Sequence, residues 1–95
     1  MSTYQLQIVT QERIVFDGEV NSLIAPGELG YLGVMAQHAP LLAALGKGDL
    51  TVRAKGNTMT GVLEGGFLEV QNNVATILAD RVEGDFIQAE AAEEE

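Results

Sequence analysis

The chain has 95 residues, of which 46% are hydrophobic and 20% charged, a composition typical of a single globular domain. Its formal net charge of −9 leaves no basic stripe for nucleic acid or anionic lipid headgroups, and the absence of cysteine excludes disulfides and zinc–thiolate centres. No apolar run approaches the ~18 residues of a membrane span, and the N-terminus lacks a signal-peptide pattern. We therefore expect a cytoplasmic chain, or its organellar equivalent, with no direct membrane insertion.

Period-two alternation of apolar and polar residues dominates the first 80 residues and predicts half-buried strands. Residues 4–8, 50–54 and 68–71 show it most clearly. Short Gly- or Asn-containing turn signals separate the runs. They are Asp17-Gly18, Pro26-Gly27, Gly46-Lys47-Gly48, Lys55-Gly56-Asn57, Gly65-Gly66 and Asn72-Asn73. Many short strands with frequent turns indicate an all-β, antiparallel sandwich or barrel.

Two segments break the β pattern. Pro40 fits the first turn of a helix, so residues 40–45 are predicted to form a short helical turn closed by Gly46. Residues 83–95 contain six of the 14 acidic residues and no basic one. We expect residues 1–83 to form the domain and residues 84–95 to form a frayed, acidic and partly helical tail, because a helix this short is marginal in water. A partner surface that carries Lys and Arg would suit this tail.

The residue inventory offers no convincing catalytic, cofactor or metal site. His38 is the only histidine, so a multi-histidine metal centre is excluded, and neither serine lies in a nucleophile elbow. From the residues alone, His38 is best interpreted as a surface or corner residue, with a binding contact as the alternative. The glycine spacing of residues 26–33 resembles a phosphate loop only faintly, because no Lys-Ser/Thr follows it. A tight irregular loop is the favoured interpretation.

Lys47 raises one alternative function. It lies in Gly46-Lys47-Gly48, a predicted exposed turn of a small acidic β domain, and biotin or lipoate carrier domains modify a lysine at such a hairpin tip. Their lysine usually follows Met or Asp, whereas this one lies between glycines. A solvated loop lysine is therefore the favoured interpretation, and a carrier domain modified at Lys47 is the alternative.

Three stretches together resemble the epsilon subunit of F-type ATP synthases, called delta in mitochondria. They are TQERIVFDGEVNSLIAPG (10–27), PGELGYLGVMAQHAPLLAALGKGDLTVR (26–53) and EGGFLEVQNNVATILAD (64–80). The combination of HAPLL, GGFLEVQNN and ILAD is specific, whereas each motif alone would be weak. The similarity runs from about residue 4 to residue 83.

The resemblance implies a ten-stranded β-sandwich and a non-catalytic rotor subunit of the central stalk. It implies that the subunit binds gamma, rests on the c-subunit ring and couples ion transport to ATP synthesis or hydrolysis, on the cytoplasmic face of the membrane. By the ungapped match, three positions would contact the c-ring: Thr10, Tyr31 and His38. Three positions would contact gamma: Ala39, Leu41 and Leu42.

The sequence departs from the family pattern in three places. Ala36-Gln37 replaces the usual Pro-Gly before His38, which would loosen the turn that aims the imidazole. Tyr31 replaces a common acidic residue. The two-helix C-terminal domain of many members is missing from the sequence, and residues 87–92 lack the Asp and Arg of the family's ATP-binding motif. The resemblance therefore implies that this chain neither binds ATP nor inhibits by extension.

Overall fold

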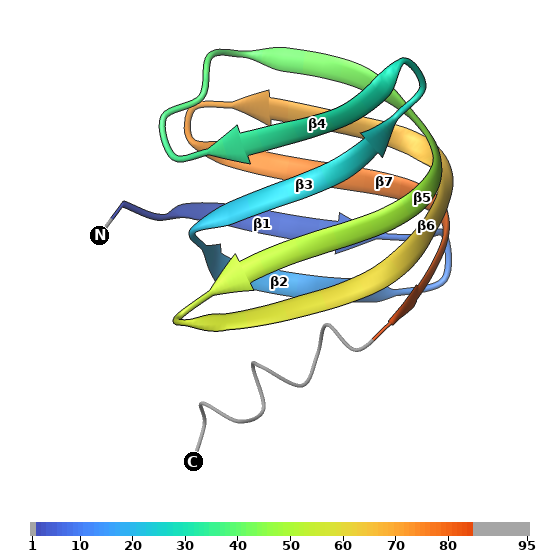
Figure 1. Cartoon of the computed structure of the whole chain (residues 1–95), viewed down its shortest axis with the longest axis horizontal. Helices are drawn as coiled ribbons and strands as arrows, with labels where there is room; N and C mark the ends of the chain where they lie inside the picture. The colour runs from blue at the N-terminus through green and yellow to red at the C-terminus, as the bar shows by residue number, and fades with distance from the viewer. Residues whose placement is uncertain (1, 85–95) are drawn as a thin grey trace.

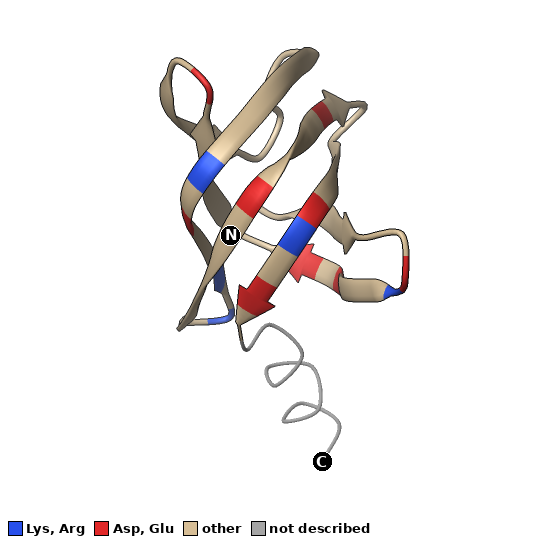
Figure 2. Cartoon of the chain, turned by 90° about the vertical axis from the view of Figure 1, so that its right-hand side faces the viewer, with Lys and Arg blue, Asp and Glu red and all other residues tan. Residues whose placement is uncertain are grey.

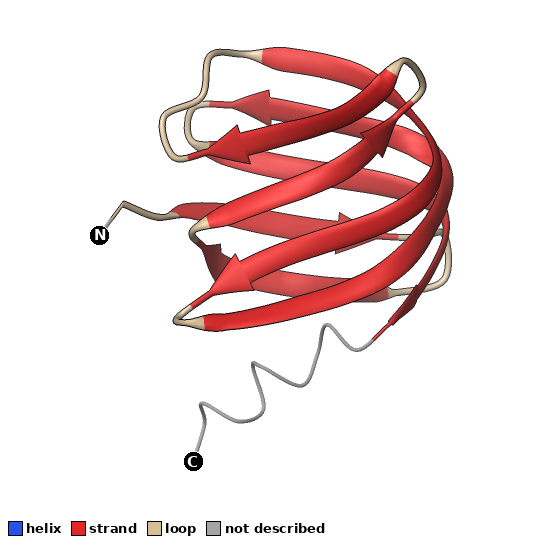
Figure 3. Ribbon diagram, in the orientation of Figure 1, coloured by secondary structure: helices blue, strands red, loops and turns tan. Residues whose placement is uncertain are grey.

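The computed structural model describes residues 2–84, which form seven β-strands and no helix (Figure 3). The strands are β1 (Tyr4–Val9), β2 (Ile14–Val20), β3 (Ser22–Gly27), β4 (Gly30–Met35), β5 (Leu41–Ala54), β6 (Asn57–Gln71) and β7 (Val74–Gly84). The all-β prediction is confirmed for this part of the chain. The tail predicted from residue 84 onward lies outside the described residues, apart from Gly84 at the end of β7.

All seven strands belong to one mixed sheet with the order β2-β1-β7-β6-β5-β3-β4. The pairing of β1 with β7 is parallel and the other pairings are antiparallel. Two predicted turns are confirmed as two-residue hairpin loops: Lys55-Gly56 joins β5 to β6, and Asn72-Asn73 joins β6 to β7. All four residues have positive φ. This left-handed geometry matches the twist of the flanking strands. The two edges of the sheet are β2 and β4.

The sheet folds over on itself along one line, which we call the crease and define by Gly46, Gly65 and Asp80. These residues are skipped in the register between neighbouring strands β5, β6 and β7. On β6 the buried side chains are odd-numbered up to Leu63 and even-numbered from Leu68, and β5 and β7 change phase in the same way. The register is the same on both sides of the skipped residues, so one unpaired residue on each strand bends the three strands together while the same face stays inside. Figure 1 shows the three strands bending together.

The crease brings two halves of the sheet face to face around a common core. One half contains β2, β1 and the portions of β7, β6 and β5 next to them, and the other contains the remaining portions with β3 and β4. The Tyr4 hydroxyl on β1 donates a 2.8 Å hydrogen bond to the Val34 carbonyl on β4, and so joins the halves. The largest fully buried side chains are aliphatic: Leu6, Ile8, Leu23, Leu50, Leu63, Leu68 and Ile77, with three valines.

The predicted helical turn at 40–45 is wrong. Residues 41–45 begin β5 and pair with residues 66–70 of β6, so a long-range ladder overrides the local preference that Pro40 suggested. Pro40 lies just before the strand, where its missing N–H disrupts no ladder.

The count of ten strands is not shown, because the described residues form seven. Gly46-Lys47-Gly48 and Gly65-Gly66, predicted as turns, lie inside β5 and β6, and Asp17-Gly18 lies inside β2. Pro26-Gly27 ends β3, and the hairpin turn follows it at residues 28–29. Glycine supplies the bend without ending the strand, so each long strand resembles two short ones in the sequence.

Candidate functional site

A row of apolar side chains crosses the outer face of the sandwich beside the crease. Cross-strand register places Ile14 against Val9, Val9 against Leu78, Leu78 against Phe67, and Phe67 against Ala44, on five successive strands. Ile14, Leu78 and Phe67 remain 55%, 56% and 53% exposed. We call these five residues the apolar row. Contiguous exposed apolar surface of this kind marks a protein-binding site more often than scattered single residues do.

The apolar row continues into a hollow beneath the β3–β4 hairpin, which we call the hairpin hollow. It has a volume of about 400 Å³ and is lined by Gly27, Glu28, Leu29, Gly30, Tyr31, Leu32, Leu42, Ala43 and Ala44. Leu29 at the hairpin turn is fully exposed, and Leu42 is 72% exposed. The Glu28 N–H donates to the Ala44 carbonyl at 3.1 Å, which ties the hairpin to β5 next to the apolar row.

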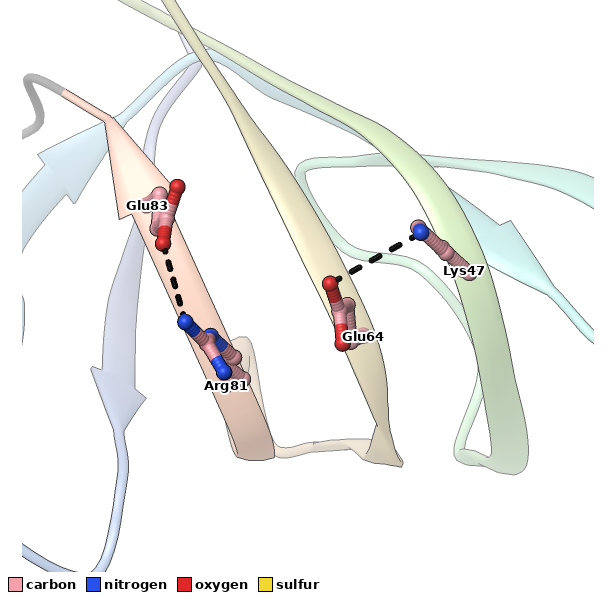
Figure 4. Close-up of polar contacts among 4 residues, drawn as sticks. All are labelled: Lys47, Glu64, Arg81 and Glu83. Carbon is pink, nitrogen blue, oxygen red and sulfur yellow. Dashed lines mark hydrogen bonds and ion pairs between the residues drawn. The ribbon is translucent and has the colours of Figure 1, made fainter.

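Charged side chains occupy the other side of the crease. Lys47 on β5 and Glu64 on β6 pair across the strands with a Nζ–Oε2 distance of 3.8 Å, and Arg81 pairs with Glu83 on β7 at 3.4 Å (Figure 4). These side chains are largely exposed, so each pair contributes only about 0–1 kcal/mol. Acidic and basic residues alternate on this side of the molecule (Figure 2). Beside the crease, a row of charged side chains on one side therefore lies next to the apolar row on the other.

Thr10 and Tyr31 both lie on the side of the sandwich that contains the crease, one near each end of it. Thr10 begins the β1–β2 turn, where its hydroxyl accepts the N–H groups of Glu12 and Arg13 at 3.3 and 3.4 Å. Tyr31 lies over Gly48 and lines the hairpin hollow, and its hydroxyl accepts the Asp49 N–H at 3.3 Å. Both side chains thus have structural contacts of their own, in addition to being accessible for binding.

His38 lies at the opposite end of the sandwich, in the β4–β5 loop (residues 36–40). The preceding Gln37 N–H donates to Asn73 Oδ1 at 2.7 Å, and Asn73 Nδ2 donates to the Thr3 carbonyl at 3.0 Å. Thr3 and Thr10 flank β1, so roughly 20 Å of extended strand separates the His38 end from Thr10. The structure therefore brings Thr10 and Tyr31 to one side and His38 to another. Figure 1 shows the β4–β5 loop at the end of the sandwich opposite the β1–β2 and β3–β4 turns.

The three positions expected to contact gamma differ in accessibility. Ala39 is exposed in the β4–β5 loop, Leu42 is exposed beside the hairpin hollow, and Leu41 is half-buried against the core. Sequence reasoning named neither Phe67 nor Leu78 as a contact residue. A signal was available, because each is adjacent to another large apolar residue, and two adjacent residues cannot share one face of a strand.

Residues 2–84 hold no cluster of side chains that could bind a metal ion. No helix within these described residues could span a membrane. Residues 26–33, with their phosphate-loop spacing, form the β3–β4 hairpin instead. Lys47 lies inside the 14-residue strand β5 and pairs with Glu64. The exposed hairpin tip on which the carrier alternative depended is therefore absent at Lys47.

Residues 3–85 match the family described as ATP synthase, Delta/Epsilon chain, beta-sandwich domain. The chain is similar to the ATP synthase epsilon chain of Pelotomaculum thermopropionicum, with 44% identity over 94 residues that cover 95% of this chain and 70% of the relative. It is also similar to the epsilon chain of Desulforamulus reducens, with 43% identity over 91 residues that cover 95% and 69%.

Solved structures with the same fold come from two mitochondrial ATP synthases. A chain of the Euglena gracilis OSCP/F1/c-ring structure superimposes with a TM-score of 0.83 and 24% identity, over 99% of this chain. A chain of the Tetrahymena thermophila central stalk/c-ring structure gives 0.71 and 16%, over 83% of this chain. This chain spans 64% of the length of each matched chain. At these identities the likeness shows the fold alone.

Proposed function

The chain belongs to the delta/epsilon family of ATP synthase subunits, whose members are non-catalytic, and on that premise we propose that it is the rotor subunit that links gamma to the c-ring. In this role it couples ion translocation to ATP synthesis or hydrolysis without taking part in the chemistry. It lies at the cytoplasmic face of the membrane as a peripheral part of the complex. The ten strands of the family sandwich would correspond to the seven strands here, with β5, β6 and β7 each divided at the crease.

The observation that carries this proposal is the apolar row with its neighbouring hairpin hollow. An adaptor in a rotor needs a durable interface, and stable interfaces bury more than about 1,000 Å² around an apolar centre. Phe67, Leu78 and Leu42 are large, exposed and held on rigid strands, which suits them as anchors. We assign this surface to gamma.

The expected c-ring contacts are proposed with a division of roles. His38 lies on the exposed loop at the end of the sandwich away from the crease, where a second partner can reach it while gamma covers the apolar row. Thr10 and Tyr31 border the gamma surface, so their c-ring contacts require the ring to approach the crease side. Support for separate gamma and His38 contact surfaces comes from the length of β1, which separates Val9 of the apolar row from the end of the sandwich that carries His38.

The proposal is tested by calorimetric titration of the chain into a catalytic sub-complex that contains gamma and has been stripped of its own epsilon chain. We expect saturable one-to-one binding, with the ATPase activity of the sub-complex not inhibited. The matched control is the same titration into a sub-complex reconstituted without gamma, which should give no heat of binding. Equal binding to both sub-complexes, or none at micromolar concentrations, would contradict the assignment of the apolar row to gamma.

A further inference from the structure

Asn73 connects three segments that lie far apart in the sequence. It is the second residue of the β6–β7 turn, with φ of 60°. Its side-chain oxygen accepts the Gln37 N–H at 2.7 Å, its side-chain nitrogen donates to the Thr3 carbonyl at 3.0 Å, and its own carbonyl accepts the Gln5 N–H at 3.3 Å. Asn73 therefore fixes the loop before His38 to the start of β1.

The loop that Asn73 holds is strained where the hydrogen bond acts. Gln37 has φ of 63°, a conformation that costs a residue with a side chain about 1–2 kcal/mol. Glycine would adopt it freely. The short hydrogen bond from the Gln37 N–H to Asn73 opposes the tendency of this residue to leave the left-handed region. The direction in which His38 leaves the loop depends on the backbone angles at Gln37.

The imidazole of His38 has one nitrogen engaged and one available. Its Nδ1 lies 2.7 Å from the Ala39 carbonyl oxygen. Because a carbonyl can only accept, Nδ1 must carry a proton, and in the neutral ring Nε2 is then the acceptor. The residue is exposed, so this acceptor faces outward on the loop that Asn73 anchors.

We propose that Asn73 is a positioning residue that, through the Gln37 N–H, holds the loop 36–40 so that His38 presents Nε2 as a hydrogen-bond acceptor to a donor group on the partner. The inference rests on the proposed function, because it assigns a role to a residue outside the contact surface of that same subunit. Asn73 itself need not touch the partner.

The test compares Asn73→Gly with Asn72→Gly. Both positions belong to the same turn and have positive φ, so glycine preserves the turn in each, but only Asn73 holds Gln37. Nitrogen NMR of the His38 ring in the free chain should show Nδ1 protonated in the unaltered chain and in Asn72→Gly. In Asn73→Gly it should show a mixture of tautomers, with faster hydrogen exchange at the Gln37 amide. An unchanged ring and amide in Asn73→Gly would overturn the inference, whatever the partner.

Binding to ATP synthase depleted of its epsilon chain supplies the second readout. We expect Asn73→Gly and His38→Ala each to weaken binding about fivefold, as for one lost hydrogen bond, and Asn72→Gly to leave it unchanged. The double variant should bind no more weakly than His38→Ala alone, since both changes remove one interaction. Additive losses, or no loss in either single variant, would overturn the positioning role. Failure of the unaltered chain to bind would instead contradict the proposed function and leave the ring readout to decide the role of Asn73.

Discussion

The Tyr4 hydroxyl and the Val34 carbonyl form a 2.8 Å hydrogen bond between strands that belong to opposite halves of the folded sheet. Tyr4 is 3% exposed and Val34 is 1% exposed, so neither group has ready access to water. Replacing Tyr4 by Phe leaves the Val34 carbonyl without this donor, and we expect the free energy of unfolding to fall by about 1–3 kcal/mol. Urea denaturation measures the change. Tyr31→Phe is the control, because Tyr31 is exposed and water can replace its hydroxyl as the acceptor for the Asp49 N–H. A loss as large in the control would contradict this explanation.

Tyr4 also makes a prediction for alkaline pH. Burial raises the pKa of the Tyr4 hydroxyl well above its ordinary value of 10.0. Above about pH 10 the unfolded chain therefore loses a proton that the folded chain keeps, so this contribution to stability, complete below pH 10, declines as pH rises further. We expect a slope of about 1.4 kcal/mol per pH unit from this group. Tyr4→Phe should lose that part of the slope and Tyr31→Phe should keep it. Identical pH profiles in unfolding experiments would contradict the prediction.

Gly66, which follows the crease residue Gly65 on β6, and Gly33 on β4 should differ sharply in how much stability is lost on substitution by alanine. A side chain at Gly66 would meet the backbone of β7, with the Ala79 Cα only 2.8 Å from the added carbon, and its φ of 129° disfavours any residue but glycine. Gly66→Ala should lower the free energy of unfolding by about 3 kcal/mol or more, from strain and overpacking together. Gly33→Ala is the matched control, because no atom lies within 4 Å of the added carbon. Thermal melts of both variants decide whether the crease requires glycine.

The sequence predicted the strands better than it predicted where they end. Alternation identified most of the chain as β, and Asn72-Asn73 marked a turn because two residues with positive φ leave a clear local signature. Gly65-Gly66 carries a similar signature but lies within β6, since the same freedom also permits a bend in a continuous strand. The distinction depends on contacts with β5 and β7, which are distant in the sequence.

The candidate site was predicted only in part for the same reason. Leu42 was named from the family match, whereas Phe67 and Leu78 of the apolar row were overlooked. Phe67 precedes the buried Leu68, and only the phase change at the crease determines which of the two faces outward. His38 and Thr10 were grouped by alignment, but their separation by the length of β1 follows from the folded topology.

Phe67 tests the apolar row directly. Phe67→Gln removes an exposed aromatic side chain, so we expect the free energy of unfolding to change by no more than about 0.5 kcal/mol. Binding to the gamma-containing sub-complex should weaken about tenfold or more, as for an anchor near the centre of an interface. Val62→Gln is the control, because Val62 is also an exposed apolar residue of β6 but lies beyond the crease, against Asp49 and Glu83. Equal effects of the two substitutions on the dissociation constant would show that gamma does not select the apolar row.

The loop before His38 yields a prediction of increased stability. Gln37 adopts φ of 63° and makes its backbone hydrogen bond to Asn73 in that conformation. Glycine removes a left-handed cost of about 1–2 kcal/mol and adds about 0.5–1 kcal/mol of chain entropy to the unfolded state. Gln37→Gly should therefore raise the free energy of unfolding by about 0.5 kcal/mol, measured by urea denaturation. Ala36→Gly, at the half-buried neighbour with no positive φ, should instead lower it. A loss of stability in Gln37→Gly would mean that the side chain of Gln37, rather than its backbone conformation, holds the loop in place.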